Sequence, residues 1–351
     1  MDDPSLNSDI IIVNHNGSDK ILSCLTSIFA SSASQSHVIV VDNASVDGSV
    51  QKIQEMFPQV HLIRSMVNLG FGDGCNLGVQ QGKNEFLVFL NPDTYVEKES
   101  IKELLVPFQS QDNLGLTTAK ILLTDQPDRI NTCGNMVHLT GLTFCRGLGS
   151  QKTAYSDMEE IAAVSGAAFA MRRKLFNELG GFDSDMFLYM EDTDLSWRVR
   201  LMGKSCLFIP TSIVFHQYSL RITPQKIFYL ERNRYLMLLK NLRWPTLFLS
   251  LPAQFLTEFM VWGYIFWKKG LSAKHKMAAY LWILKHWRAI MKKRKDIQLL
   301  RLASDKTLLE KTQFEIDFSQ MSQGSLSTLS RLVFNPIFFV LRRMSLILVW
   351  W

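Results

Sequence analysis

Residues 86–94 read Phe-Leu-Val-Phe-Leu-Asn-Pro-Asp-Thr. An apolar run, 86–90, stops abruptly at a short polar turn that carries one carboxylate, Asp93. The run has the length and composition of a strand that is buried on both faces, as in a parallel sheet. Asn, Pro and Asp are all turn formers, so the chain is expected to leave the sheet directly after residue 90.

Other apolar runs of strand length precede this one, and segments of helical length separate them. The runs cover 9–15, 37–42 and 60–64, and helices are expected at about 18–31, 47–57 and 73–83. This alternation predicts an α/β domain whose mostly parallel sheet has helices on both faces. Right-handed crossovers bring the strand ends to one edge, where open sheets bind ligands. Asn14, Asp42, Arg64 and Asp93 should therefore line one crevice.

The following residues predict further elements of the same domain. They are a helix at 99–109, a strand at 114–123, an irregular stretch at 124–160 that could form a flap or an insertion, a strand of small residues at 161–171, helices at 173–179 and 193–202, and strands at 206–209 and 212–216.

Charge divides the chain unevenly. Residues 1–225 carry 17 Lys+Arg and 25 Asp+Glu, a net charge of −8. Residues 226–351 carry 21 Lys+Arg and 7 Asp+Glu, a net charge of +14. All but one of the eight tryptophans lie after residue 225. We therefore expect an α/β domain over 1–225 and a helical, basic, Trp-rich region over 226–351. Basic charge would suit nucleic acid, but together with Trp and long apolar runs it favours an anionic membrane surface.

Two apolar segments lie in the basic region. Residues 246–267 are long enough to span a bilayer, but Lys and Arg are abundant on both sides, against the positive-inside tendency. Residues 332–351 are similar, with Arg342 and Arg343 in the middle. We expect helices that lie in the membrane interface; a spanning helix and a plain packing helix are the alternatives.

The helix expected at 226–241 has one apolar face. Its Arg232 and Arg234 could reach a diphosphate, or they could form a solvated basic face. Five cysteines without CxxC spacing favour reduced thiols in a cytosolic setting, and the acidic N-terminus does not read as a secretory signal.

Each polar group at a strand end has a functional and a structural interpretation. Asp93 could hold a divalent cation against a diphosphate or simply form a turn. Asp42 could accept hydrogen bonds from a nucleobase or ribose, or it could belong to a helix N-cap cluster with Ser45 and Asp47. His216 ends a strand and could be a metal ligand or structural.

Two stretches open helices. Glu191 and Asp192 could supply a general base, or they could be acids that favour the first turn of a helix. The glycine-rich stretch 68–78 could approach phosphates closely. It is not a dinucleotide fingerprint, because Leu77 occupies the last glycine position, and no GxxxxGK[ST] loop exists. A nicotinamide dehydrogenase and a P-loop NTPase are therefore excluded.

Residues 9–216 resemble the family 2 glycosyltransferases, which have a GT-A, Rossmann-like fold, and especially their rhamnosyltransferase-like branch. The resemblance rests on motifs in one order: Ile12-Val-Asn14, Val-Val-Asp42-Asn-Ala-Ser-Val-Asp47-Gly-Ser, Asn68-Leu-Gly-Phe-Gly72, Leu90-Asn-Pro-Asp93, Ser165-Gly-Ala, Gly180-Gly-Phe-Asp183, Glu191-Asp192 and His216.

The resemblance implies a role for each matching residue. Asp42 would bind the nucleoside of a sugar donor, and the donor-binding set would be Asn14, Asp42, Asn68, Gly72 and Asn91. Asp93 and His216 would bind Mg²⁺ or Mn²⁺, with Asn91 in place of the first aspartate of the family's D-x-D motif, which would weaken the metal site. Asp192 is favoured over Glu191 as the catalytic base.

The implied reaction is inverting transfer of one sugar from a nucleoside-diphosphate sugar to a hydroxyl of a lipid-linked saccharide, in cell-surface polysaccharide synthesis. Rhamnose follows from branch resemblance only. The enzyme would be peripheral, at the cytoplasmic face of the membrane, with no nucleic-acid partner. The chain lacks the Q-x-x-R-W motif of processive members, which favours single transfer.

Two other classes of protein are alternatives to this function. A nucleotidyltransferase that makes sugar nucleotides would need a glycine- and arginine-rich loop after the first strand, which residues 14–17 do not supply. A non-enzymatic binding protein would leave Asp42, Asp93 and Asp192 unexplained. The oligomeric state does not follow from the sequence.

Overall fold

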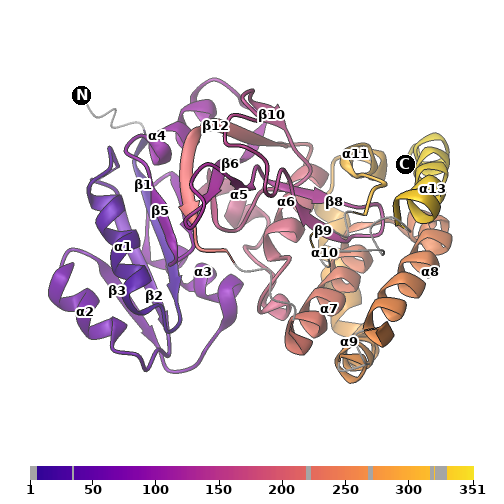
Figure 1. Ribbon diagram of the computed structural model, residues 1–351, viewed down its shortest axis with the longest axis horizontal. Coiled ribbons are helices and arrows are strands. Elements are labelled where there is room, and N and C mark those ends of the chain that lie inside the picture. Colours follow the sequence, from indigo (N-terminus) through magenta and orange to yellow (C-terminus); the bar gives the residue numbers. More distant parts are fainter. Residues whose placement is uncertain (1–5, 34, 219–222, 268–271, 317–319, 321–329) are drawn as a thin grey trace. The chain divides into compact units, whose positions relative to one another are not determined.

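The computed structural model describes residues 6–33, 35–218, 223–267, 272–316, 320 and 330–351 (Figure 1). The chain divides into two compact units. The first comprises Met1–Asn135, Cys145–Val199 and Lys204–Tyr218, and the second comprises Met136–Phe144, Arg200–Gly203 and Ser219–Trp351. A single division at residue 225 did not anticipate the two short segments, 136–144 and 200–203, that join the helical unit.

The first unit is built on a mixed, mostly parallel sheet with the strand order β10-β12-β6-β11-β4-β1-β2-β3. Its strands are β1 (Ser8–Asn14), β2 (His37–Asn43), β3 (His61–Ser65), β4 (Phe86–Leu90), β5 (Thr94–Val96), β6 (Leu114–Leu123), β7 (Ile130–Thr132), β10 (Glu159–Glu160), β11 (Ala168–Arg172) and β12 (Ser205–His216). The first four are mutually parallel, as predicted, and β11 lies antiparallel between β4 and β6.

Helices cover both faces of this sheet, which confirms the predicted fold class. They are α1 (Ser18–Phe29), α2 (Ser49–Met56), α3 (Gly70–Gln81), α4 (Ser100–Leu105), α5 (Arg173–Glu178) and α6 (Glu191–Leu201). Adjacent residues of β1 point to opposite faces. Ile12 therefore packs in the cluster that contains Leu25 of α1, whereas Val13 packs in the cluster that contains Cys75 of α3.

Four predicted elements differ clearly from those observed. Helix α3 begins at Gly70, three residues earlier than predicted. The strand expected at 161–171 forms only at Ala168–Arg172, because the residues before it make a turn. The strands expected at 206–209 and 212–216 are one strand, β12, whose register shifts between Ile209 and Ile213. That irregularity accommodates Pro210, which has no N–H for the sheet.

The second unit is helical. Its helices are α7 (Pro224–Asn241), α8 (Trp244–Trp267), α9 (Ala273–Lys285), α10 (Trp287–Leu300), α11 (Asp305–Lys311) and α13 (Asn335–Leu348). Strands β8 (Asn135–Val137) and β9 (Thr143–Cys145) form a hairpin whose residues 136–144 belong to this unit. Within the described ranges, none of the helices combines the length and the apolar composition that a bilayer crossing requires.

Candidate active site

The predicted alignment of the strand ends is present. In the parallel ladders, Asn14 pairs with Asp42, and Asp42 pairs with Arg64. On the other side of β1, Leu90 pairs with Ile12, so the turn that contains Asp93 leaves the sheet beside the end of β1. The sheet order runs to β2 on one side of β1 and to β4 on the other. This switch in direction is where open α/β sheets bind ligands.

Asp42 holds the ends of β1 and β2 together. It is only 2% exposed. Its Oδ1 accepts a hydrogen bond from Asn14 Nδ2 at 3.0 Å, and its Oδ2 accepts one from the Ser45 amide at 3.1 Å. The start of α2 is bound instead by Asp47, which accepts from the Ser49 amide at 3.1 Å. Asn14 Oδ1 is buried without a hydrogen-bond partner, so one acceptor in this cluster is unused.

Strained backbone gathers in the loops around this edge. Seven of the described non-glycine residues have positive φ angles, and six of them lie after β1, after β2 or directly before α6. These six are Asn16 (53°), Ser18 (45°), Ala44 (59°), Phe187 (54°), Tyr189 (70°) and Met190 (68°). The seventh, Tyr155 (57°), lies elsewhere. Such conformations cost about 1–3 kcal/mol each and cluster at active sites. The loops are therefore held in shapes that local preference does not supply.

The turn after β4 meets the end of β12. His216 Nε2 lies 3.2 Å from Asp93 Oδ1 and 3.4 Å from Asn91 Nδ2. His216 Nδ1 lies 2.9 Å from Asn131 Oδ1, which can only accept. With Nδ1 donating to Asn131, the protonated ring donates from Nε2 to Asp93, whereas the neutral ring turns the Nε2 lone pair towards Asp93. Burial acts to raise the pKa of Asp93, but the hydrogen bond and charge of His216, together with Lys20, outweigh it, and the pKa is lowered.

Asp192 is held at the start of α6 by donors on both of its oxygens. Oδ2 accepts from the Gly166 amide at 2.7 Å and from Asn135 Nδ2 at 3.0 Å. Oδ1 accepts from the Thr193 amide at 2.7 Å, with the Thr193 hydroxyl at 3.2 Å. Burial raises the pKa of Asp192, although these donors oppose the shift. Because the hydroxyl is a rotor, it can turn away and free one position on Oδ1.

Glu191 contrasts with its neighbour. It is buried, and its Oε2 has no hydrogen-bond partner. Burial, with the charge of Asp192, raises the pKa of Glu191 to about 8. At neutral pH Glu191 is therefore mostly protonated, whereas Asp192 has the donors that stabilise a carboxylate.

Hydrogen bonds connect these groups in space. The Asn91 amide donates to the Ala167 carbonyl at 3.0 Å, and the adjacent Gly166 amide binds Asp192. The turn 165–167 thus lies between the end of β4 and the start of α6. On the other side, Asn43 Nδ2 donates to the Gly70 carbonyl at 2.8 Å, and the Phe71 amide donates to the Phe187 carbonyl at 2.8 Å. These bonds tie the end of β2 to the strained loop before Glu191.

The sequence and structure of this region were compared with those of known proteins. The family described as "Glycosyl transferase family 2" matches residues 9–180. Residues 9–180, about half of the chain, belong to this family. A Mycobacterium tuberculosis (strain ATCC 25618 / H37Rv) protein named N-acetylglucosaminyl-diphospho-decaprenol L-rhamnosyltransferase is 28% identical over 203 residues, 51% of this chain and 66% of the relative. A Staphylococcus epidermidis poly-β-1,6-N-acetyl-D-glucosamine synthase is 21% identical over 58% of this chain and 48% of its own. The match therefore spans about half to two thirds of these relatives.

Solved structures share the GT-A fold of this family member. GalNAc-T7, crystallised with UDP, GalNAc and Mn²⁺, superposes with a TM-score of 0.54 at 18% identity, over 68% of this chain and 48% of that one. Residues 1–349 of S. aureus TarS give a TM-score of 0.51 at 16% identity, over 96% and 90% of the two chains. At these identities the likeness establishes the fold.

The two remaining donor-binding candidates of this glycosyltransferase family member have clear packing roles. Asn68 Oδ1 accepts from the Gly70 amide at 2.9 Å. Gly72 is buried, and a Cβ placed there would lie 3.0 Å from the Cβ of Phe182, so a larger residue would crowd that side chain. Their donor-binding roles stay predictions.

Sequence reasoning missed the groups that hold the candidate catalytic residues. Gly166 lies in the quoted Ser165-Gly-Ala motif, which was given no role. Asn131 and Asn135 lie in the stretch expected to be irregular, where no pattern distinguished them. Arg234 of the second unit was expected to reach a diphosphate or to lie on a solvated face. It is instead buried and paired with Glu231 and Glu258.

Replacing Glu191 by glutamine should change how stability depends on pH. Below its ordinary pKa of 4.5, Glu191 is neutral in both states. As pH rises from there towards about 8, unfolding releases a proton, so the free energy of unfolding of the parent protein falls, on the order of a few kcal/mol in total. Glu191→Gln lacks this loss. Urea unfolding should show the variant gaining stability relative to the parent between pH 5 and pH 8; a difference independent of pH would contradict the buried neutral acid.

Proposed function

We propose that this chain is an inverting glycosyltransferase that moves one sugar from a nucleoside-diphosphate sugar to an acceptor hydroxyl. The observation that carries the proposal is the turn 165–167, which binds the Asn91 amide on one side and the Asp192 carboxylate on the other. This link supports the proposal because it joins a carboxylate, which can accept a proton, to the strand end proposed to hold the diphosphate. Family membership supports this combination of donor and base.

On the donor side, Asp42 and Asn14 are the proposed nucleoside contacts. Asn14 Oδ1 has no protein partner, but it is buried against Gly17, so a base or ribose donor would reach it only with a shift of the loop after β1. The end of β4 supplies Asn91 and Asp93 for the diphosphate. Lys20 also bears on Asp93, as its effect on the pKa of that group shows, so the strand end is not purely anionic.

The residues at the β4 end fit a divalent cation. No group of three or more His, Cys, Asp or Glu side chains suited to a metal ion occurs among the described residues. Mg²⁺ and related ions, however, are commonly held by one or two protein carboxylates together with substrate phosphates. Asp93 and His216 would be the protein ligands, because the bond from His216 Nδ1 to Asn131 directs the Nε2 lone pair towards Asp93. When bound, Mg²⁺ or Mn²⁺ would neutralise charge on the leaving diphosphate.

On the acceptor side, Asp192 is the proposed base. Rotation of the Thr193 hydroxyl frees a lone pair on Oδ1, which takes the proton of the acceptor hydroxyl. The acceptor oxygen then forms a bond to the sugar C1 from the face opposite the diphosphate, the C1–O bond to the diphosphate breaks, and the anomeric centre inverts. Because Glu191 is mostly neutral at neutral pH, it adds no second negative charge beside Asp192.

The acceptor and donor classes come from similarity. The mycobacterial relative is named for rhamnosyl transfer to a decaprenol-linked diphosphosaccharide. We accordingly propose a lipid-linked saccharide acceptor, rhamnose as the first donor sugar to test, and a peripheral position at the cytoplasmic face of the membrane. The absence of Q-x-x-R-W from the sequence supports transfer of a single sugar.

A panel of nucleotide sugars tests this function. The full chain is heated with dTDP-rhamnose, UDP-GlcNAc and GDP-mannose, each with and without Mn²⁺. At a hundredfold excess over Kd, a ligand adds about 2.7 kcal/mol, which should raise the melting temperature by several degrees. We expect one donor to stabilise the protein only with Mn²⁺, and the same donor to release its nucleoside diphosphate when acceptor is added. Failure of all three nucleotide sugars to stabilise the protein, with or without Mn²⁺, would contradict the proposal.

A further inference from the structure

Helix α8 of the second unit turns several polar residues towards the protein, whereas most of its large aromatic residues face outwards. Its buried side chains are Thr246, Ser250, Ala253, Thr257, Met260, Tyr264 and Ile265. Its exposed side carries a stripe of large apolar residues at helical spacing: Trp244, Phe248, Leu251, Phe255, Phe259 and Phe266. A helix on the surface of a water-soluble domain normally shows the reverse arrangement. The stripe is far more apolar than scattered surface residues would be.

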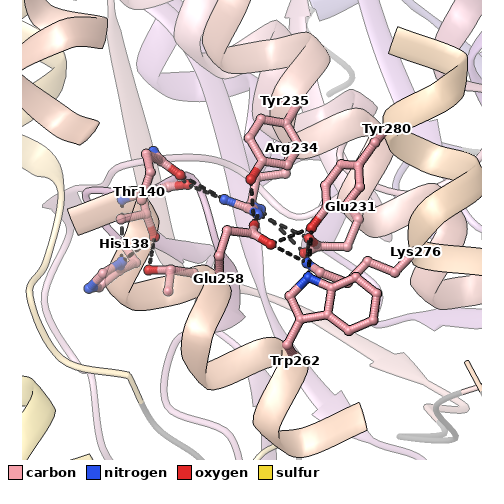
Figure 2. Close-up of polar contacts among 11 residues, drawn as sticks. His138, Thr140, Glu231, Arg234, Tyr235, Glu258, Trp262, Lys276 and Tyr280 are labelled. Carbon is pink, nitrogen blue, oxygen red and sulfur yellow. Dashed lines mark hydrogen bonds and ion pairs between the residues drawn. The ribbon is translucent and has the colours of Figure 1, made fainter. Parts of the chain in front are cut away.

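A buried network of charges fixes α8 in this orientation (Figure 2). Glu258, on the inner side of α8, pairs with Arg234 of α7, and its other oxygen lies 2.9 Å from Lys276 Nζ of α9. The hydroxyls of Tyr235 and Tyr280 both donate to the same carboxylate. Burial acts to raise the pKa of Glu258, but Arg234 and Lys276 outweigh it and lower the pKa to about 2.

The hairpin segment 136–144 adds a second attachment to the same side of α8. Thr257 Oγ1 lies 3.1 Å from Thr140 Oγ1, and Gln254 Oε1 accepts from Arg234 Nη1 at 2.8 Å. Arg234 also donates to the Thr140 carbonyl at 3.3 Å. Turning α8 to bury its aromatic side would break these bonds and leave two buried cations, Arg234 and Lys276, with the single carboxylate of Glu231 between them, which is costly. The outward stripe is therefore a fixed feature of the unit.

Helix α13 repeats the pattern. It packs against α8, and it exposes Ile337, Val340, Met344 and Ile347 at helical spacing. Exposed basic side chains accompany these faces on α9 and α10, directly before α13 and within it; they include Lys274, Lys285, Arg288, Lys292, Lys295, Arg331 and Arg343. Two copies of so basic a region would repel each other, whereas an anionic surface would attract it.

We infer that the outer sides of α8 and α13 are a docking surface for an anionic phospholipid bilayer, with the aromatic stripe in the interface and the basic side chains at the headgroups. Apolar aromatic residues with flanking Lys and Arg are the composition of helices that lie in this plane. The inference rests on the peripheral location proposed above and names the surface responsible. It does not depend on which sugar is transferred.

Vesicle flotation of the full chain tests the surface. The probe is phosphatidylcholine containing about one third phosphatidylglycerol, at low and high salt. The exposed side chains of Phe255 (72%) and Phe259 (71%) are replaced together by glutamate, and Phe248→Ser is a milder second variant. Met56→Glu, on α2 of the first unit, is the matched control because Met56 is also exposed. We expect the parent and the control to float equally, and the double variant to partition at least about tenfold less.

Two further readouts keep the outcomes distinct. Mn²⁺-dependent stabilisation by UDP or dTDP reports on the first unit, so a variant that keeps it but loses flotation has lost the surface alone. Light scattering without vesicles reports on self-association. The inference is overturned if the parent does not float, if the stripe variants float as well as the control, or if the parent is a dimer that the double variant dissociates. If neither UDP nor dTDP stabilised the parent in the presence of Mn²⁺, that result would instead count against the proposed function.

Discussion

Replacing Asp192 by asparagine should abolish sugar transfer while leaving nucleotide binding in place. The amide keeps the size of the carboxylate, but it cannot take a proton from the acceptor hydroxyl. Positioned proton transfer contributes about 10²- to 10⁴-fold, so kcat should fall by at least about a hundredfold. Initial rates of nucleoside diphosphate release in the presence of acceptor measure the loss, and calorimetry with UDP and Mn²⁺ measures the retained binding.

Glu191→Gln is the comparison that makes the Asp192 result specific. Glu191 is the adjacent carboxyl, it is buried, and its raised pKa of about 8 makes it mostly neutral near pH 7. The Glu191→Gln variant should therefore lose much less turnover than the Asp192→Asn variant. Glu55→Gln, on the far end of α2 from the strand ends, controls for loss of charge. If Glu191→Gln lost as much activity as Asp192→Asn, the base would have to be reassigned.

The second large effect is expected at the end of β4. Asp93→Asn and His216→Ala should each weaken Mn²⁺-dependent binding of UDP by at least about tenfold, because each removes a proposed metal ligand. Asn131→Ala should have a smaller effect in the same direction, since Asn131 only fixes the ring nitrogen that carries the proton. Titration of Mn²⁺ into protein with UDP measures all three.

The matched control is Asp19→Asn, which changes an exposed carboxylate of α1 that pairs with Lys52. It should bind Mn²⁺ and UDP as the parent does. Chelation of the metal should reduce the parent to the level of Asp93→Asn. Binding that is insensitive to chelator and unchanged in Asp93→Asn would remove the cation from the account.

The strand ends were predictable because sheet geometry follows from residue pattern. Continuous apolar runs separated by helices indicate parallel strands joined by right-handed crossovers. The ends of β1, β2 and β4 then lie on one edge of the sheet. Asp42 and Asp93 were placed by this reasoning alone. The positions of Asp192 and His216 relative to that edge were not, because they depend on long-range pairing of β11 and β12; the resemblance to a family supplied them.

The remaining features depend on tertiary contacts that no local pattern records. Asn135 reads as an ordinary polar residue, yet it donates to Asp192 across 57 positions of the chain. Arg234 reads as part of a basic face, but its charge is matched by Glu231 and by Glu258, which is 24 positions away. The apolar character of α8 was visible in the sequence; which side it turns outwards was decided by the ion pairs beneath it.

The claim that one site unites the donor, the cation and the base is tested most directly by crystals of Asp192→Asn grown with UDP and Mn²⁺. Anomalous scattering from manganese locates the ion without reference to the protein. The account predicts a single strong peak between Asp93, His216 and the diphosphate, with the nucleoside at Asp42 and residue 192 facing the open side of the diphosphate. A manganese peak remote from Asp93, or UDP bound away from the ends of β1 and β4, would contradict it.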